Sequence, residues 1–386
     1  MQLAVYSTMF GAPWGGSEEL WSGAVHHLLR RGHQAAVSVN RRCRAAPQLA
    51  ALCDAGAAVE LRRHASVGRS LRRIMQRLDV GQHPARGWLE THQPDLVLIS
   101  IGLHGDDLSL ARTCQWLGVP YALLLQAASP HHQFDADECD AQHAAYAGAW
   151  RRYFVSDENR RTVESSFALD LSDSRVVDNP FNVQVGAPLP WPASGERWRL
   201  ACVARLHTQA KGQDALLQTL RQDKWRRRPL EVVFWGQDGG SRQRLEQLIH
   251  LFGLAGQVRF GGFADSIEAV WRDHHALVLP SRYEGNPLAM IEAMLCGRPP
   301  IVTNVGRAAE LIDDNRTGFV AAAATVEALD DALERAWRRR HEWPAIGAAA
   351  AQTIRQRHSL TPAEDFAAEL LAAAEEVHAH GQSHAA

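Results

Sequence analysis

Residues 275–297 combine two carboxylates with the start of a helix, in the run HALVLPSRYEGNPLAMIEAMLCG. Glu284 lies in a loop just before the predicted helix, and Glu292 lies inside the helix. Open backbone N–H groups at a helix start favour an anion, above all a phosphate. Carboxylates on either side would repel that phosphate unless they contact neutral hydroxyl groups. The combination therefore predicts a sugar nucleotide, although two solvated glutamates on an ordinary helix have the same spacing.

A second run, CVARLHTQAKGQD at 202–214, supplies positive charge. Arg205 comes just after a predicted strand, and Lys211 precedes Gly212 near the start of a helix. Two such cations can neutralise a diphosphate and stabilise it as a leaving group. Both could instead be ordinary surface charges. However, Lys211 and Lys224 are the only lysines in the chain, which favours a phosphate-binding role for Lys211.

The elements that position these residues can be read from the same segments. Residues 276–279 form a short apolar run, ALVL, that predicts a buried strand. Asn286 is expected to cap the following helix, with Pro287 at its first position and Gly297 at its end. Apolar residues recur along that helix at the spacing of a buried stripe.

Short apolar runs alternate with helical stretches along the chain, which predicts parallel sheets covered by helices. One series begins with LAVYST and a second with WRLACVARL, and residues 179–194 between them are rich in proline and glycine. A chain of 386 residues exceeds one typical domain. We therefore expect domains at residues 1–184 and 185–358, followed by a C-terminal helix at 359–386 with a disordered tail.

At this point the chain resembles the retaining GT-B glycosyltransferases of family 4, also called group 1. The resemblance rests on YEGNPLAMIEAM followed by CGRPPIVTNVGRAAELIDDNRTGFV. It covers nearly the whole chain and is strongest from Cys202 to Val320. It implies an α/β protein with two Rossmann-like, doubly wound parallel-sheet domains that face a central cleft. It also implies that the last helix packs back on the first domain.

The resemblance further implies transfer of a sugar from a nucleoside-diphosphate sugar, with no cofactor and no metal. Arg205 and Lys211 would hold the diphosphate, Glu284 a sugar hydroxyl, and Glu292 the ribose. The spacing between the two cations is one residue longer than is usual in the family. The other donor-binding residues expected are Gly15, Gly16, Gln126, Gly236, Phe263, Gly285, Asn286, Pro287 and Leu288.

Some of these positions have equally plausible structural interpretations. Gly15 and Gly16, in GAPWGGSE, would let backbone N–H groups approach the donor, but a tight turn would also explain them. Gln126 stands where many relatives carry a histidine that reaches the sugar; glutamine can still bind a hydroxyl but cannot be charged. Gly236 lies in a glycine-rich turn, which is a weak signal alone. Phe263 could lie beside the nucleobase or in the core.

Two other function classes stay open. An inverting transferase, or a related sugar-nucleotide epimerase, would use different chemistry; inversion would need a base, for which His104, His131 and His132 are candidates. A non-catalytic protein could keep the donor pocket without turnover. The presence of Glu284, Arg205, Lys211 and Glu292 together argues against that second class.

Composition limits the partners. The net charge is −2 at pH 7, which argues against a nucleic-acid binder that relies on overall basicity. Six cysteines without a C-x-x-C pair predict reduced thiols in a cytoplasmic protein. The first ten residues lack the pattern of a signal peptide, and no segment approaches the roughly 18 apolar residues of a spanning helix. The acceptor could be a glycan, a lipid-linked molecule, a protein or a small metabolite.

Two charged segments have competing interpretations. Asp135 and Asp137 form a D-x-D that could hold a metal, but a flexible acidic loop near the acceptor is favoured. Residues 62–77 predict a basic amphipathic helix that could contact an anionic membrane at its inner face or an acceptor diphosphate. A solvated helix face with its apolar side in the core is slightly favoured. The arginines concerned are Arg62, Arg63, Arg69, Arg72, Arg73 and Arg77.

Overall fold

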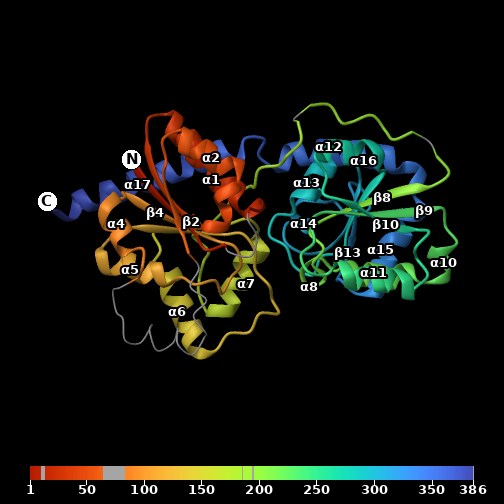
Figure 1. The fold of residues 1–386 in the computed structure, drawn as a ribbon, viewed down its shortest axis with the longest axis horizontal. Helices are drawn as coiled ribbons and strands as arrows, with labels where there is room; N and C mark the ends of the chain where they lie inside the picture. Colours follow the sequence, from red (N-terminus) through yellow and green to blue (C-terminus); the bar gives the residue numbers. More distant parts are fainter. Residues whose placement is uncertain (10–13, 64–82, 185, 194, 386) are drawn as a thin grey trace. The chain divides into compact units, whose positions relative to one another are not determined.

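The computed structural model describes residues 1–9, 14–63, 83–184, 186–193 and 195–385 (Figure 1). The chain divides into two units. Unit 1 consists of residues 1–180 and 361–386, and unit 2 of residues 181–360. Unit 2 therefore begins four residues before the predicted second domain and ends two residues after it.

Unit 1 contains a seven-stranded parallel sheet in the order β3-β2-β1-β4-β5-β6-β7. The order reverses at β1, which pairs with β2 on one side and β4 on the other. This is the doubly wound arrangement expected for a Rossmann-like domain. The strands are β1 (Gln2–Ser7), β2 (Gln34–Asn40), β3 (Ala58–Arg62), β4 (Leu96–Ile101), β5 (Tyr121–Leu125), β6 (Arg151–Phe154) and β7 (Arg175–Val176).

Helices cover both faces of this sheet, so its central strand β4 is buried along its whole length. One core contains Leu3 and Val5, and the other contains Ala4, as alternation along β1 requires. The helical segments of unit 1 are α1 (Gly16–Arg30), η1 (Arg41–Ala45), α2 (Pro47–Asp54), α4 (Arg86–His92), α5 (Ser109–Leu117), α6 (Ala136–Ala147), α7 (Asp157–Phe167) and α17 (Pro362–Ala385).

The last helix belongs to the core of unit 1. Phe366 and Leu370 of α17 are buried in the same cluster as Trp21 of α1. The two helices approach closely at Gly23, where an added Cβ would lie 2.7 Å from Ala363 Cβ. α17 extends to Ala385, into the segment for which the sequence predicted a disordered tail. No helix within the described ranges is long and apolar enough to cross a bilayer.

Unit 2 contains a six-stranded parallel sheet in the order β10-β9-β8-β11-β12-β13, with its reversal between β8 and β11. The strands are β8 (Trp198–Val203), β9 (Leu230–Trp235), β10 (Val258–Gly262), β11 (Ala276–Leu279), β12 (Pro300–Thr303) and β13 (Phe319–Ala321). The helical segments are α8 (Thr208–Lys211), α9 (Gln213–Leu220), α10 (Asp223–Arg226), α11 (Arg242–Leu251), α12 (Ile267–Asp273), α13 (Leu288–Leu295), α14 (Ala308–Leu311), α15 (Val326–Arg338), η2 (Arg340–Glu342) and α16 (Trp343–Arg357).

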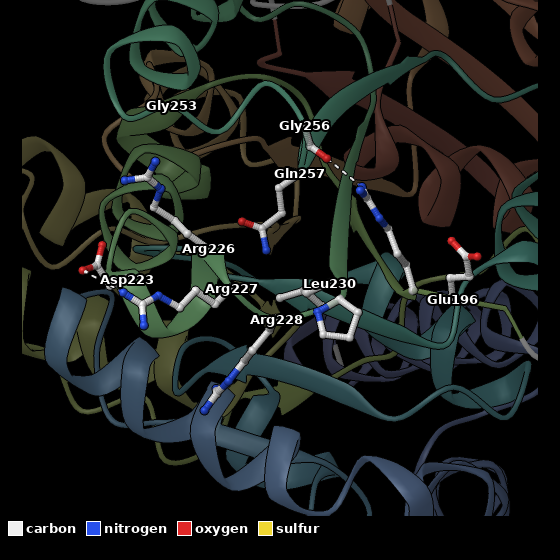
Figure 2. Close-up of a pocket in the computed structure, with 11 residues that line it drawn as sticks. Glu196, Asp223, Arg226, Arg227, Arg228, Leu230, Gly253, Gly256 and Gln257 are labelled. Carbon is white, nitrogen blue, oxygen red and sulfur yellow. Dashed lines mark hydrogen bonds and ion pairs between the residues drawn. The ribbon is translucent and has the colours of Figure 1, made fainter.

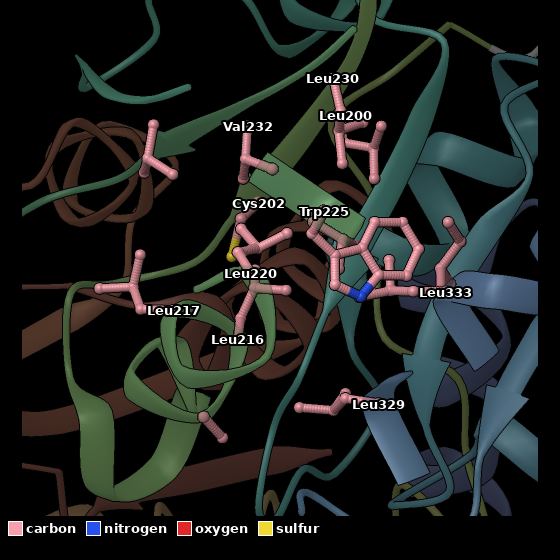
Figure 3. Close-up of a cluster of buried hydrophobic side chains, with 14 of the residues drawn as sticks. Leu200, Cys202, Leu216, Leu217, Leu220, Trp225, Leu230, Val232, Leu329 and Leu333 are labelled. Carbon is pink, nitrogen blue, oxygen red and sulfur yellow. The ribbon is translucent and has the colours of Figure 1, made fainter. Parts of the chain in front are cut away.

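Two apolar layers enclose the sheet of unit 2. On one side, Trp225 fills the space between Leu200, Val232 and Leu329 (Figure 3). On the other side, α13 buries Ile291 and Met294. α13 is therefore held rigidly against the sheet, and the loop before it begins from a fixed position.

Candidate functional site

The predicted donor residues gather at the carboxyl ends of the strands in unit 2. β8 and β11 are neighbours in the sheet, and the strand order reverses between them. The loops that follow two such strands turn toward opposite faces of the sheet and leave a crevice, which is where α/β proteins bind ligands. The loop after β8 carries Arg205 and Lys211, and the loop after β11 carries Glu284.

Glycines bring the loops of this crevice into backbone contact. Gly212 has φ +62°, and a Cβ there would lie 1.9 Å from the carbonyl oxygen of Pro280. Gly306 has φ +59°, and a Cβ there would lie 2.2 Å from the carbonyl oxygen of Gly285. Both positions need a residue that adopts positive φ and has no side chain. The loops after β8, β11 and β12 are thus packed directly against one another.

Lys211 and Glu284 meet across the crevice. Lys211 Nζ lies 2.6 Å from Glu284 Oε1 and 2.7 Å from Oε2. Ser281 Oγ donates a further hydrogen bond of 2.7 Å to Glu284 Oε1. Only 9% of Glu284 is exposed, so the ion pair fixes both side chains at the base of the crevice. The sequence predicted both residues but not their pairing.

A second ion pair joins the loop after β11 to the start of α9. Arg282 binds the carboxylate of Asp214 through two hydrogen bonds, of 2.7 and 2.9 Å. Its backbone N–H also donates to the carbonyl oxygen of Ala210 at 2.8 Å. A bidentate pair of this kind fixes the orientation of both partners. Arg282 was not predicted as a site residue.

Arg205 follows β8 and is exposed. Its carbonyl oxygen accepts a hydrogen bond of 2.7 Å from Gln213 Nε2, which fixes the backbone. Its guanidinium makes no hydrogen bond and no ion pair with any residue that the structure describes. Because its backbone is fixed and its guanidinium is unpaired among the described residues, Arg205 can bind an anionic ligand.

The start of α13 offers backbone donors. The N–H groups of Gly285, Asn286, Leu288 and Ala289 have no acceptor among the described residues. Unpaired N–H groups at a helix N-terminus form an anion-binding site. They lie directly after Glu284 in the chain, so anion donors and a carboxylate adjoin as predicted from the sequence.

The predicted cap of this helix is wrong. α13 begins at Leu288 and its N-cap is Pro287, whose ψ of 99° is extended. Because this backbone conformation is not helical, the helix begins after Pro287. The side chain of Asn286 lies 3.3 Å from His358 Nε2 instead of capping the helix.

Glu292 lies within α13 and is almost completely buried, with 4% of its surface exposed. Its Oε1 accepts hydrogen bonds from the backbone N–H of Asn182 at 2.9 Å and from Asn182 Nδ2 at 3.2 Å. Burial raises the pKa of Glu292 to about 7. The position of Glu292 on the helix agrees with the prediction, whereas the contact with Asn182 was not foreseen.

Two further predicted residues follow β9 and β10. Gly236 has φ +141°, and a Cβ there would lie 2.2 Å from the carbonyl oxygen of Ala204, so this glycine lets the loops after β8 and β9 touch. Phe263 is 68% exposed. The alternative interpretation of Phe263 as a core residue is therefore wrong.

The predicted residues of unit 1 lie after β1 and β5. Gly15 is the N-cap of α1 and has an extended backbone that any residue can adopt; Gly16 is the first residue of the helix. Gln126 is 6% exposed, and its Oε1 accepts a hydrogen bond of 2.9 Å from Asn179 Nδ2. Asn179 is 4% exposed, and sequence reasoning placed it only in a linker.

Glu18 is a buried carboxyl that sequence reasoning missed. It lies in the first turn of α1 and is 1% exposed. Ser7 Oγ donates to its Oε1 at 2.8 Å, and Trp21 Nε1 donates to its Oε2. Burial raises the pKa of Glu18 to about 7. The acid at the third position of a helix looked like an ordinary first-turn acid, so no signal distinguished it.

The buried carboxyls predict a dependence of stability on pH. Glu18 and Glu292 retain protons in the native state up to about pH 7, whereas the reference carboxyl loses its proton near 4.5. As the pH rises, the free energy of unfolding falls wherever the native state binds more protons than the unfolded state. The free energy of unfolding is therefore expected to fall between pH 4.5 and pH 7, by roughly 3 kcal/mol or less for each group.

The measurement is urea unfolding of wild type and of the variants Glu18→Gln and Glu292→Gln at pH 5 and pH 7.5. Each variant should lose less stability than wild type between the two pH values, because glutamine cannot ionise. The exposed residue Glu327 provides the control variant Glu327→Gln, which should behave as wild type. Equal slopes for all four proteins would contradict the prediction.

His104 was a candidate base for an inverting reaction. It is 1% exposed, and its Nδ1 accepts a hydrogen bond of 3.2 Å from the backbone N–H of Ser129. The ring proton therefore lies on Nε2. Burial lowers the pKa of His104 to about 4. Its one basic nitrogen is occupied by the backbone, which makes it unsuitable as a base.

The candidate D-x-D begins a helix instead of forming a flexible loop. Asp135 is the N-cap of α6, and its carboxylate accepts a hydrogen bond of 3.0 Å from the N–H of Glu138. Glu138 in turn accepts from the N–H of Asp135, which completes a capping box. Within the described ranges, no group of three or more His, Cys, Asp and Glu residues could hold a metal ion.

The predicted basic helix at residues 62–77 begins differently. Arg62 is the last residue of β3, so the start of this segment is a strand. Arg63 follows the strand and is exposed. The remainder of the segment lies outside the described residues.

A hollow of about 740 Å³ lies at the opposite end of the sheet of unit 2 (Figure 2). Its lining includes Leu230, the first residue of β9, and Gln257, which directly precedes β10. Several arginines surround it, but the guanidinium groups of Arg226 and Arg228 point in different directions (Figure 2). Because its charged groups do not converge and it lies at the amino ends of the strands, we do not assign the donor site to it.

A comparison with known proteins matches a protein family to unit 2, which holds most of the predicted donor residues. The protein family described as "Glycosyl transferases group 1" matches residues 197–339. A GDP-mannose-dependent alpha-(1-6)-phosphatidylinositol monomannoside mannosyltransferase of Mycobacterium tuberculosis is 33% identical over 173 residues, which are 42% of this chain and 43% of that protein. A D-inositol 3-phosphate glycosyltransferase of Frankia alni is 33% identical over 169 residues, which are 39% and 42% of the two chains. The chain thus spans less than half the length of these relatives.

One solved structure illustrates the likeness in fold. The Anabaena protein HepE in complex with UDP matches with a TM-score of 0.71 and 19% identity, over 96% of this chain and 100% of that chain. Both sheets of the present chain have the doubly wound parallel order. The predicted fold class, GT-B with two Rossmann-like units, is therefore confirmed.

Proposed function

We propose that this protein is a glycosyltransferase, because residues 197–339 match the family described as "Glycosyl transferases group 1". In this proposal, it moves a sugar from a nucleoside-diphosphate sugar to an acceptor hydroxyl, retains the anomeric configuration and needs no metal or other cofactor. The protein is proposed to act in the cytoplasm, in the synthesis of glycans, polysaccharides or glycoconjugates. The observation that carries the proposal is the Lys211–Glu284 pair next to the open N–H groups at the start of α13.

The diphosphate of the donor is assigned to the positive side of the crevice. Arg205 reaches it from the loop after β8, and Lys211 shares its charge between the diphosphate and Glu284. The N–H groups of Gly285, Asn286 and Leu288 bind the same group from the start of α13. Three kinds of donor converge on one anion, which supports binding of a leaving group that gains charge as it departs.

The carboxylates are assigned to hydroxyl groups. Glu284 is held in place by Lys211 and Ser281, so its orientation is fixed before the sugar arrives. It is proposed to accept a hydrogen bond from a hydroxyl of the transferred sugar. Glu292 is proposed to bind the ribose, since one of its oxygens already serves Asn182 and the other has no donor among the described residues.

The remaining donor contacts come from residues of different chemistry. Phe263 offers an exposed ring for stacking against the nucleobase. Gln126 is proposed to bind a hydroxyl of the sugar, and Gly15 and Gly16 to admit the donor close to the backbone. Gly236 and Pro287 shape the loops that carry these groups.

Retention follows in this proposal from attack on the same face as the leaving group. The bond between the anomeric carbon and the phosphate oxygen breaks, and the bond to the acceptor oxygen forms. The acceptor proton passes to the departing phosphate oxygen. Inversion would require a separate base, and the buried, neutral state of His104 removes one of its three candidates.

The Phe263 ring gives a prediction about affinity. Phe263→Ala is expected to weaken donor binding about 5- to 100-fold, since stacking of a base on an aromatic ring contributes about 1–3 kcal/mol. The ring is exposed, so the unfolding midpoint in urea should change little. Calorimetric titration with the donor measures the effect. The exposed apolar residue Leu251 provides the control Leu251→Ala, and equal affinity of Phe263→Ala and this control would contradict the assignment.

A panel of UDP-, GDP- and ADP-sugars tests the function itself. The correct donor is expected to raise the unfolding temperature and to support transfer to a hydroxyl acceptor. NMR of the product then gives the anomeric configuration, and a product with inverted configuration would reject the retaining mechanism. Binding without transfer or hydrolysis would indicate a non-catalytic protein. Activity that disappears on addition of a chelator would reject metal independence.

A further inference from the structure

Arg62 lies at the carboxyl ends of the strands in unit 1, and its guanidinium is held there by an aromatic ring and a backbone carbonyl oxygen. It is the last residue of β3, and its side chain crosses the end of β2 to reach β1. Its guanidinium carbon lies 3.4 Å from the centre of the Tyr6 ring. Its Nη2 donates a hydrogen bond to the carbonyl oxygen of Ser7, the last residue of β1.

No carboxylate neutralises this guanidinium among the residues that the structure describes. Glu60 lies two residues earlier on β3, but its carboxylate accepts a hydrogen bond of 2.8 Å from Ser38 Oγ. The Nε of Arg62 is buried and has no partner within the described ranges. Burial lowers the pKa of Arg62 to about 9, and no acid raises it again.

A fully buried arginine in unit 2 shows how a guanidinium can be satisfied without an acid. Arg298 is 1% exposed, and its Nε donates to the carbonyl oxygens of Trp271 and His274 at 2.8 and 2.9 Å. Its Nη2 donates to the carbonyl oxygen of Pro190 at 2.6 Å. Arg298 thus has several acceptors, whereas Arg62 has one for its five N–H donors among the described residues.

The guanidinium of Arg62 has one acceptor among the described residues, which leaves its other N–H groups available to an anion. The position of Arg62 fits such a role. Ligands of doubly wound sheets bind at the carboxyl ends of the strands, next to the reversal of strand order. In unit 1 that reversal lies between β1 and β4, and Arg62 is fastened to the last residue of β1.

We propose that Arg62 binds a phosphate group of the acceptor, which makes the acceptor a phosphorylated molecule. The planar guanidinium fork suits two oxygens of one phosphate, and its contacts with Tyr6 and Ser7 orient it before the ligand arrives. This inference rests on the proposed glycosyltransferase activity, whose donor it leaves unchanged. The phosphate belongs either to a small phosphorylated polyol or to a phospholipid headgroup.

Binding can be measured without turnover. The Nε–Hε resonance of Arg62, assigned by its loss in Arg62→Gln, is followed during titration with inorganic phosphate, glycerol 3-phosphate and myo-inositol 1-phosphate. A saturable shift with at least one of these probes is expected, and glycerol and myo-inositol should cause none. The exposed residue Arg44 gives the matched control Arg44→Gln, which should keep the shift. No shift with any probe would overturn the proposal.

Vesicles distinguish the two sources of the phosphate. Phosphatidylinositol in phosphatidylcholine vesicles should compete with the soluble probes if the acceptor is a phospholipid, and phosphatidylcholine alone should not. Competition by neither vesicle, with the soluble shift intact, assigns a small phosphorylated acceptor. Calorimetric titration of Arg62→Lys with the same soluble probes tests the guanidinium itself, and wild-type affinity in this variant would show that the planar fork is not required and would overturn its role.

Transfer assays separate this inference from the function on which it rests. With a working donor, Arg62→Gln is expected to lower kcat/KM for a phosphorylated acceptor about 10- to 100-fold relative to Arg44→Gln, because a hydrogen bond to a charged group contributes about 1.5–3 kcal/mol. Donor hydrolysis should stay unchanged. Equal kcat/KM in the two variants would overturn the role of Arg62, whereas absence of donor binding and hydrolysis in wild type would overturn the proposed function instead.

Discussion

Replacing Lys211 by methionine is expected to lower kcat/KM for sugar transfer by roughly 100- to 1,000-fold. The substitution keeps an unbranched side chain but removes the ammonium group that is proposed to stabilise the departing diphosphate. Loss of one group that stabilises transition-state charge typically costs about 3–4 kcal/mol. The same change leaves the buried carboxylate of Glu284 without its partner, next to the proposed site of an anion. Steady-state kinetics with the donor found in the panel measures the effect.

Lys224 provides a matched control, since it is the other lysine of the chain and also forms an ion pair in unit 2. Its Nζ lies 2.6 Å from Asp330 Oδ2. Lys224→Met should cost at most about 1 kcal/mol of stability, because surface ion pairs contribute little. It should keep kcat/KM within about threefold of wild type, because Lys224 is not among the proposed donor contacts. Equal activity in the two variants would refute the assignment of Lys211.

The double variant Lys211→Met with Glu284→Gln separates charge balance from chemistry. Removing both partners relieves the unpaired carboxylate, so stability should recover relative to Lys211→Met alone. Activity should not recover, because both a cation and a hydroxyl acceptor are then missing. Recovery of activity in the double variant would mean that Lys211 only neutralises Glu284.

The donor half of the site could be predicted because its signals are local. The apolar run at 276–279 and the proline after it mark the end of β11, so the carboxyl end of that strand was known. Strand order then brings the loops after β8 and β11 together, as in other doubly wound sheets. What could not be predicted is the bond between Lys211 and Glu284. It spans 73 residues and depends on the loop geometry that Gly212 permits.

Other features depend on backbone or burial that no local pattern gives. Asn286 and Pro287 have the residue types of a cap and a first helical position, but the extended ψ of Pro287 delays the helix. Arg62 carries the charge pattern of a basic helix and yet ends a strand. Asn179 lies in a segment with the composition of a linker, and only the fold brings it to Gln126.

Gly212→Ala is expected to damage both activity and stability, although it adds one carbon outside the proposed ligand contacts. The residue has φ +62°, where an alanine costs about 1–2 kcal/mol. The added Cβ would also lie 1.9 Å from the carbonyl oxygen of Pro280, so the loops after β8 and β11 must separate. Separation moves Lys211 from Glu284, and a displacement of about 1 Å can lower the rate about a hundredfold.

Gly240→Ala isolates the steric part of this effect. Gly240 lies after β9 with φ +94°, but a Cβ there meets no atom within 4 Å. This variant should carry the backbone strain alone and lose about 1–2 kcal/mol of stability while kcat/KM stays near wild type. Gly212→Ala should lose the same stability or more and at least a hundredfold in kcat/KM. If both variants lose activity equally, strain explains the result and contact between the two loops is not what aligns the site.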